Sequence, residues 1–259
     1  MNDTLKVAMI QADILWEDSR ANLRRYRDLL KGMAVHPDLI IFPEMFTTGF
    51  SVNPEQNAEQ MSGESVSWLA QMAGDLDSSL AGSLIIEENK RYFNRFVLID
   101  PEGEIQHYDK RHLFRMGNEE SHFQRGSERK IFKLGEWRIC PQICYDLRFP
   151  VWSRNRNDYD VLIYVASWPE SRRDAWKTLL KARAIENLSY CIGVNRIGTD
   201  GRGICYAGES MVVNGKGQIL NDVKADSEDV IISGLSLPEL RKLRNDFPAY
   251  KDADRFQLE

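Results

Sequence analysis

The sequence lacks the features that mark membrane proteins and nucleic-acid-binding proteins. None of its segments approaches the roughly 20 consecutive apolar residues of a membrane span, and the first residues lead into a strand-like segment without a basic or apolar leader. The formal net charge is −5, and there is no basic block and no alternation of aromatic and basic residues. We therefore expect a cytoplasmic protein that binds neither membranes nor nucleic acid.

Cysteine and histidine are also scarce, with four of each in the sequence. No pair of cysteines has the C-x-x-C spacing, and the histidines lack metal-ligand spacing, so we expect no metal. Cys140 and Cys144 lie in one extended segment, where four strand steps of about 3.3 Å separate their Cα atoms by roughly 13 Å. A disulfide needs Cα atoms within about 7 Å. At least one of these two thiols is therefore expected to be free.

What the sequence does contain is the composition of a globular α/β protein, with 42% hydrophobic and 28% charged residues. A chain of this length can bury roughly 70–75% of its unfolded surface without disulfides or metal. Alternating strand-like and helix-like patterns predict sheets covered by helices. Without repeats or linkers, we expect one domain over residues 1–259. The predicted strands cover residues 5–12, 38–42, 79–86, 92–100, 136–144, 161–166, 190–195 and 210–213, the helices 17–34, 66–76, 149–157 and 173–188, and a long ordered loop 106–130.

Three polar residues lie at strand ends or in the long loop, where such folds tend to place functional groups. Cys144 ends one predicted strand and precedes a helix, so the turn would expose its sulfur beside main-chain N–H groups. Glu44 follows another strand in an apolar setting, which suits a general base working near neutral pH. The Lys110 ammonium could serve as a fixed cation beside an oxyanion. The structural alternatives are a buried thiol, a solvated loop glutamate and a surface basic segment.

Together these segments resemble the nitrilase superfamily of carbon–nitrogen hydrolases. Phe42-Pro43-Glu44 is similar to the superfamily's glutamate motif, the heptapeptide YDKRHLF at 108–114 to its lysine motif, and the octapeptide ICYDLRFP at 143–150 to its cysteine motif. The three occur in the expected order and at family-like separations, and the resemblance extends over residues 6–234.

The resemblance implies a fold, a mechanism and an assembly. The fold would be a four-layer α-β-β-α sandwich. Glu44, Lys110 and Cys144 would form a catalytic triad that cleaves a small amide through a cysteine thioester, without a metal or an organic cofactor. Members commonly pair through a helical face, so we expect a homodimer.

Two supporting groups also follow from the resemblance. The superfamily has a second glutamate shortly before a glycine, and Glu119 matches this by its seven-residue distance from Gly126, with Glu120 as a one-residue alternative. The main-chain N–H of Tyr145 would join the lysine at the oxyanion. One departure is Glu209, in Gly-Glu-Ser at 208–210, where many members have Gly-His-Ser.

Within the superfamily, the segments at 111–116 and 144–152 are most similar to bacterial omega-amidases. Those enzymes hydrolyse the terminal amide of 2-oxoglutaramate or 2-oxosuccinamate to the 2-oxo acid and ammonia. An acidic substrate of this kind needs a cation, and guanidinium binds carboxylate in a bidentate manner. The candidates for this part of the site are Arg148, Arg172 and Arg173, with Trp168 in the pocket wall; the alternative for each arginine is a surface position.

Three other functions stay open. A papain-like hydrolase would need a histidine well after its cysteine, but the histidines, at 36, 107, 112 and 122, all precede Cys144. A non-catalytic interaction module could use the same fold. Finally, an aliphatic amidase, an N-carbamoyl amidase or a nitrilase would share the triad, which cannot separate them.

Overall fold

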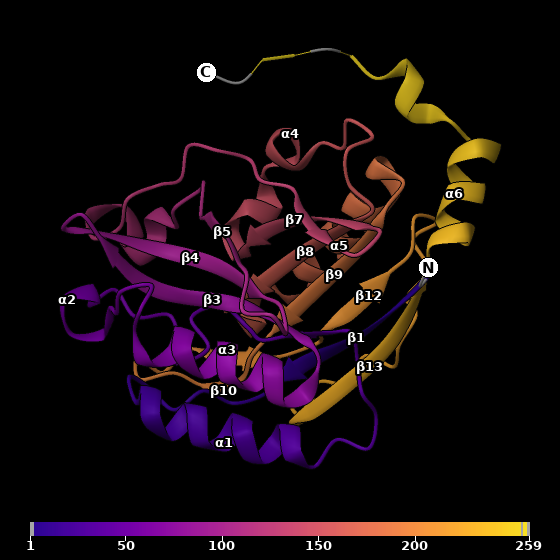
Figure 1. Ribbon diagram of the computed structural model, residues 1–259. Helices are drawn as coiled ribbons and strands as arrows, with labels where there is room; N and C mark the ends of the chain where they lie inside the picture. Colours follow the sequence, from indigo (N-terminus) through magenta and orange to yellow (C-terminus); the bar gives the residue numbers. More distant parts are fainter. Residues whose placement is uncertain (1–2, 255, 258–259) are drawn as a thin grey trace.

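The computed structural model describes residues 3–254 and 256–257, and these form two β-sheets stacked face to face with helices on both outer sides (Figure 1). The layers are therefore those of the predicted four-layer α-β-β-α sandwich. The prediction of a single domain over residues 1–259 includes residues 1–2, 255 and 258–259, which lie outside the described residues. That the chain forms one domain stays a prediction.

The first sheet has six strands, and those in its centre are parallel. In spatial order they are β13 (Asp229–Ser236), β1 (Thr4–Gln11), β2 (Leu39–Ile41), β3 (Ser79–Glu88), β4 (Arg91–Ile99) and β5 (Ile105–Asp109). β1 is antiparallel to β13, and β3, β4 and β5 form an antiparallel meander.

The second sheet has five strands, of which β7, β8 and β9 are parallel. Its spatial order is β12 (Met211–Val213), β9 (Tyr190–Asn195), β8 (Val161–Ala166), β7 (Trp137–Ile143) and β6 (Phe132–Leu134), and a separate small pair is formed by β10 (Ile197–Thr199) and β11 (Cys205–Ala207). Strands buried on both faces should have continuous apolar sequences, and this is why β8 and β9 could be predicted as short apolar runs.

Helices cover the outer face of each sheet. α1 and α3 pack side by side against the first sheet, and α5 packs against the second. The α-helices are α1 (Ser19–Lys31), α2 (Pro54–Asn57), α3 (Glu64–Leu76), α4 (Pro150–Ser153), α5 (Arg173–Asn187) and α6 (Leu237–Asp246), and the 3₁₀ turns are η1 (Arg115–Gly117), η2 (Glu119–Ser121), η3 (Cys144–Arg148), η4 (Glu170–Arg172) and η5 (Ala249–Asp252).

Three apolar layers hold the sandwich together. The central layer lies between the sheets, where Met9 and Ile41 of the first sheet belong to the same cluster as Ile163 of the second. The outer layers bury the apolar faces of the helices, such as Leu23 of α1 and Trp176 of α5. Because amphipathic helices gain most of their stability from such burial, the apolar stripes on α1 and α5 were visible in the sequence.

The parallel strands bring the candidate site to one edge of the two sheets. Residues that follow β2 and β7 lie beyond the carboxyl ends of these strands, where α/β folds commonly bind ligands. Glu44 follows β2, Lys110 follows β5, and Cys144 follows β7. The fold thus collects side chains from both sheets at the edge between them.

Three sequence-based expectations need correction. The expected loop 106–130 includes most of β5 as well as η1 and η2, and the expected helix 149–157 is only the four-residue α4. The chain leaves that helix because the Asn155 side chain donates to the carbonyls of Tyr159 and Asn187. β13 was not expected, because it is a half-exposed edge strand whose pairing with β1 spans more than 200 residues of sequence.

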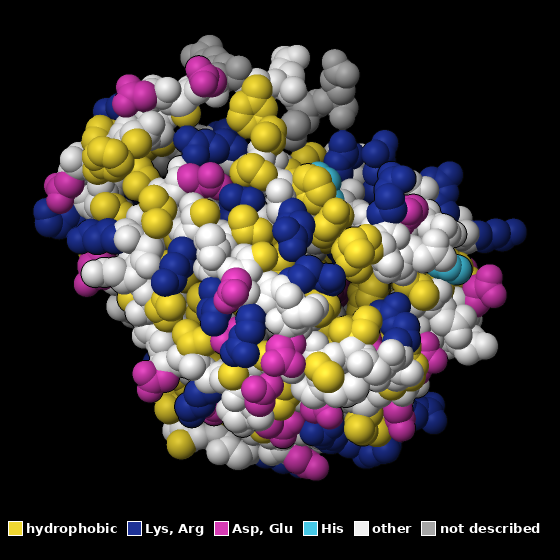
Figure 2. Space-filling view, turned by 180° about the vertical axis from the view of Figure 1, so that it is seen from behind, with side chains coloured by type: hydrophobic (Ala, Val, Ile, Leu, Met, Phe, Trp, Pro, Cys, Tyr) yellow, Lys and Arg dark blue, Asp and Glu magenta, His cyan; other side chains and the backbone are white. Residues whose placement is uncertain are grey.

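The surface carries both signs of charge. Lys and Arg side chains are interspersed with Asp and Glu on the face in Figure 2. In the part of the chain that the structure describes, no helix has the length and apolar character needed to cross a membrane.

Candidate active site

A lysine ammonium lies between two glutamates in the interior of the protein. Lys110 Nζ is 2.8 Å from Glu44 Oε1 and 3.0 and 2.8 Å from the two carboxylate oxygens of Glu119. All three side chains have 0% exposure to solvent. Burying charges in this way is costly unless each charge is paired and hydrogen-bonded, so the surrounding contacts decide whether the cluster can exist.

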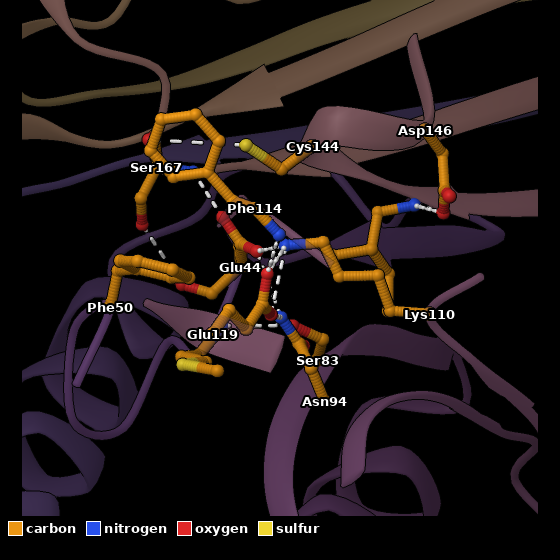
Figure 3. Close-up of polar contacts among 12 residues, drawn as sticks. Glu44, Phe50, Ser83, Asn94, Lys110, Phe114, Glu119, Cys144, Asp146 and Ser167 are labelled. Carbon is orange, nitrogen blue, oxygen red and sulfur yellow. Dashed lines mark hydrogen bonds and ion pairs between the residues drawn. The ribbon is translucent and has the colours of Figure 1, made fainter. Parts of the chain in front are cut away.

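The remaining carboxylate contacts come from three separate segments (Figure 3). Asn94 Nδ2 of β4 donates to Glu44 Oε1 at 2.8 Å and to Glu119 Oε1 at 3.2 Å. The Ser167 N–H, after β8, donates to Glu44 Oε2 at 2.8 Å. The Phe114 N–H donates to Glu119 Oε2 at 2.6 Å. Every carboxylate oxygen in the cluster therefore accepts at least one hydrogen bond.

The backbone of Lys110 is fixed from both sides. Its N–H donates to the carbonyl of Asn94, and its own carbonyl accepts from the Gly126 N–H at 2.8 Å. A Cβ at Gly126 would come within 2.2 Å of the Asp109 carbonyl oxygen, so only glycine allows this approach. This contact gives a physical reason for the glycine that follows Glu119 by seven residues.

Electrostatics within the cluster favour the charged lysine. Burial lowers the pKa of Lys110, but the Glu119 and Glu44 carboxylates more than offset this and raise the pKa above its usual value. Burial raises the pKa of Glu119, Lys110 opposes the rise, and the nearby charge of Glu44 adds to it. With two carboxylates facing one ammonium, the pKa of Glu119 lies above its usual value.

Cys144 is held at a strained turn next to this cluster. It ends the approach from β7 and begins η3 with φ of +43°, a conformation that is uncommon for a residue with a side chain. Its Sγ lies 4.0 Å from the carbonyl oxygen of Ser167. Burial raises the pKa of the Cys144 thiol well above its usual value, and Glu44 raises it further through its charge and a hydrogen bond, whereas Lys110 lowers it. The thiol is therefore neutral at rest near pH 7.

A buried aspartate connects the cysteine turn to the lysine segment. Asp146 Oδ2 accepts from the Ile143 N–H at 3.0 Å and from the Tyr108 hydroxyl at 2.9 Å. Its Oδ1 accepts from the His112 N–H at 2.9 Å and lies 2.7 Å from His112 Nδ1. Because the Asp146 carboxylate binds Ile143, just before Cys144, and residues on both sides of Lys110, the two segments are held at a fixed separation.

The cluster and the thiol open into one pocket. It encloses about 460 Å³ of free space, part of which opens to solvent. The lining side chains include the three predicted catalytic residues and four other predicted ones, and they are Glu44, Lys110, Cys144, Tyr145, Arg148, Trp168 and Arg172, with Phe50, Phe114, Ser167, Pro169, Arg202, Ile204 and Tyr206.

The other predicted residues lie outside this lining. Glu119 is behind Lys110, whereas the alternative Glu120 lies 3.9 Å from the exposed Arg115, so the geometry favours Glu119 as the second glutamate. Arg173 forms an ion pair with Glu209 at 2.6 Å. None of the four histidines lines the pocket, and all four are described residues.

Several further residues of the site were missed from the sequence, among them Asn94 and Arg202. Asn94 lies within an apolar strand, where a buried polar side chain is the only available signal. Arg202 lies between Gly201 and Gly203, and its guanidinium is 5.4 Å from the centre of the Phe50 ring in the pocket wall. Without the fold, this loop could not be assigned to the site.

Comparisons with known proteins agree with this geometry. The family model for carbon–nitrogen hydrolases matches residues 6–245. The omega-amidase YafV of Yersinia enterocolitica is 44% identical over 98% of this chain and 99% of its own length. The 2-oxoglutaramate amidase of Bacillus subtilis (strain 168) is 30% identical over 95% of this chain and 96% of its own.

A solved structure of a related protein is similar to this chain in both fold and sequence. XC1258 from Xanthomonas campestris, described as a CN-hydrolase superfamily protein with an arsenic adduct in the active site, superposes with a TM-score of 0.96 at 42% identity and covers 99% of both chains. The fold, the family match and the full-length relatives lead to one conclusion: the chain belongs to the carbon–nitrogen hydrolase family and is an enzyme of that family.

Proposed function

We propose that this enzyme is an omega-amidase that hydrolyses the terminal amide of a small 2-oxo acid, such as 2-oxoglutaramate or 2-oxosuccinamate, to the 2-oxo acid and ammonia. The observation that carries the proposal is a buried Glu44–Lys110–Glu119 cluster beside a cysteine, in a pocket that also contains arginines. The names of the two relatives, omega-amidase and 2-oxoglutaramate amidase, support the substrate class.

In the proposed first step, Cys144 attacks the amide carbonyl and forms a carbon–sulfur bond. Its proton passes to Glu44, with which the thiol interacts in the resting state. Because burial keeps the thiol neutral, proton transfer accompanies the attack rather than preceding it. A carboxylate that receives this proton within hydrogen-bonding distance acts as a general base.

The negative charge that develops on the carbonyl oxygen needs stabilisation. We assign this role to the Lys110 ammonium and to the main-chain N–H of Tyr145 at the start of η3. Donors that are already fixed in a dry site stabilise an oxyanion without reorganising solvent, and one such donor contributes about 3–4 kcal/mol.

Collapse of the tetrahedral intermediate breaks the carbon–nitrogen bond. Glu44 returns its proton to the departing nitrogen, which leaves as ammonia, and a thioester on Cys144 remains. Water then attacks the thioester and gives its proton to Glu44, which passes it on to the sulfur when the acid leaves. Each proton is accounted for on these side chains, and the proposed mechanism uses no metal or organic cofactor.

Recognition of the substrate carboxylate is assigned to arginines at the pocket. Arg148 lies over the Trp168 ring at 4.9 Å and Arg172 over the Phe114 ring at 5.4 Å, so aromatic faces hold both guanidiniums in place. Arg202, with 34% side-chain exposure, donates to the Phe50 carbonyl at 3.2 Å. Arg202 is also 3.6 Å from Asp200 Oδ2 but lines the pocket. Arg173 was predicted for the same role, but it pairs with Glu209 at 2.6 Å and lies outside the pocket lining, which ranks it below these three.

We also propose a homodimer, on the basis of the family resemblance and of large apolar side chains on helical segments. Val151 of α4, Ile185 of α5 and Phe247 after α6 are 50%, 51% and 61% exposed. Light scattering in solution should give the mass of two chains, and the mass of one chain would exclude the dimer. The cytoplasmic location stays a prediction.

Steady-state ammonia release should identify the substrate class. We expect turnover of 2-oxoglutaramate and 2-oxosuccinamate with the highest kcat/KM, because both have a carboxylate at the end opposite the amide. Cys144→Ala should abolish turnover, and Cys205→Ser, at an exposed cysteine, should be close to wild type. Preference for N-carbamoyl-β-alanine, propionamide or a simple nitrile would reject the omega-amidase assignment.

Arg202→Met should separate carboxylate recognition from chemistry. A charge-assisted hydrogen bond of about 1.5–3 kcal/mol corresponds to a rise of roughly 10- to 100-fold in KM for 2-oxoglutaramate. Turnover of propionamide, which has no carboxylate, should not change. Arg20→Met on the exposed face of α1 is the matched control. Equal losses on both substrates would show that Arg202 does not read the carboxylate.

Alkylation of Cys144 by iodoacetamide should depend on pH in a way that reports the resting thiol. The thiolate is the form that reacts with iodoacetamide. Because the pKa of Cys144 is raised, the rate of its alkylation should still increase between pH 8.5 and pH 10. Glu44→Gln removes a charge that raises this pKa and should shift the profile to lower pH. The rate is measured by mass spectrometry of the Cys144 peptide. A plateau below pH 8 would mean that Cys144 is a thiolate at rest.

A further inference from the structure

The resting lysine has no hydrogen left for a substrate. An ammonium group has three N–H bonds, and Lys110 Nζ has three carboxylate contacts: Glu44 Oε1 at 2.8 Å, Glu119 Oε2 at 2.8 Å and Glu119 Oε1 at 3.0 Å. Stabilising an oxyanion therefore requires Lys110 to release one carboxylate oxygen. The side chains of Lys110 and Glu44 both have 0% exposure to solvent in this arrangement.

The Asn94 side chain donates to two of the three carboxylate oxygens that contact Lys110. Asn94 Nδ2 has two N–H bonds, and they point to Glu44 Oε1 and Glu119 Oε1, at 2.8 and 3.2 Å. Lys110, just after β5, and Asn94, in β4, thus both bridge Glu44 Oε1 and Glu119 Oε1, as the dashed lines in Figure 3 show. Glu119 Oε1 is the acceptor with the longest lysine contact, and it would keep the Asn94 bond if that contact were released.

The orientation of Asn94 indicates that this bridge has a function. Its Oδ1 is buried and has no hydrogen-bond partner among the residues that the structure describes. Reversing the amide would turn this oxygen towards two carboxylates, so the donor-inward orientation is the only favourable one. Buried polar atoms without partners are rare in proteins, and one that persists beside a reactive site needs an explanation.

We propose that Asn94 is a positioning residue that keeps Glu119 and Glu44 hydrogen-bonded while Lys110 turns one N–H from Glu119 Oε1 to the oxyanion of the reacting amide. This role rests on the proposed amidase function. Without the Asn94 donor, the same movement would leave a buried carboxylate oxygen with no donor. The penalty arises only as the oxyanion forms, so it falls on kcat more than on KM.

The role also predicts a change in pH dependence. The titratable groups that face Asn94 or its partners are Glu44, Glu119, Lys110 and Cys144, from the segments after β2, in η2, after β5 and after β7. A hydrogen bond to a carboxylate favours its ionised form, so removing Asn94 favours protonated Glu119. The acid limb of the kcat profile should therefore move to higher pH.

The test compares Asn94→Leu, Asn94→Asp and a structural control, with kcat normalised by titration of reactive Cys144. We expect Asn94→Leu to lower kcat about 10- to 100-fold, the loss expected for a hydrogen bond to a charged group, with KM within about threefold. Asn187→Leu removes a buried amide that donates to the Arg183 carbonyl and accepts from the Asn155 N–H, away from the pocket. This control should lose stability without changing the pH profile.

Asn94→Asp is informative even if Asn94→Leu does not fold. A protonated aspartic acid can still donate one hydrogen bond, whereas the aspartate cannot. The ratio of the kcat of Asn94→Asp to that of the wild type should therefore be highest at the lowest pH measured and should fall as pH rises. A constant ratio across pH, or Asn94→Leu with a kcat within twofold of wild type and an unshifted profile, would overturn the proposed role. A wild-type enzyme that hydrolyses no amide would instead contradict the proposed function.

Discussion

The structure depends on one costly arrangement, an ammonium and two carboxylates buried together without solvent. A buried charge pair is tolerated only when hydrogen bonds satisfy its remaining atoms, and here they come from β4, from the segment after β8 and from the backbone at Phe114. These segments belong to both sheets and to the loop between them. The sandwich therefore has to close before the cluster is complete, and the site is as rigid as the packing of the two sheets.

The protonation state of Cys144 depends on its burial and on the charges of the neighbouring cluster. Burial and then the nearby Glu44 carboxylate raise the pKa of Cys144, so the enzyme at rest carries a neutral thiol, and the proposed mechanism assigns the base to Glu44. The strained φ of +43° and the Asp146 anchor hold the sulfur at the end of β7. In the proposed mechanism, the positive charge of Lys110 is not used to stabilise a resting thiolate. It stabilises the oxygen of the substrate when that oxygen becomes negative in the transition state.

Much of the fold and of the candidate site could be predicted from the sequence. The features that could not be predicted were missed for physical reasons. Apolar strands that end just before Glu44 and Cys144 indicated two of the proposed catalytic positions, and the motif around Lys110 indicated the third. The presence of glycine at position 126, seven residues after Glu119, is explained by its close contact with the Asp109 backbone. Asn94 and Arg202 could not be predicted, because their roles depend on which strand and loop reach the site, and β13 was missed because its partner lies far away in the sequence.

The central claim is that the carbon–nitrogen bond is broken through a covalent bond to Cys144 beside the buried cluster. Rapid acid quenching of the enzyme during turnover of 2-oxoglutaramate, followed by peptide mass spectrometry, tests it most directly. The account predicts an acyl group on the Cys144 peptide that appears and decays within the time of one turnover. An acyl group on another residue, or continued ammonia release with Cys144 unmodified at every quench time, would contradict it.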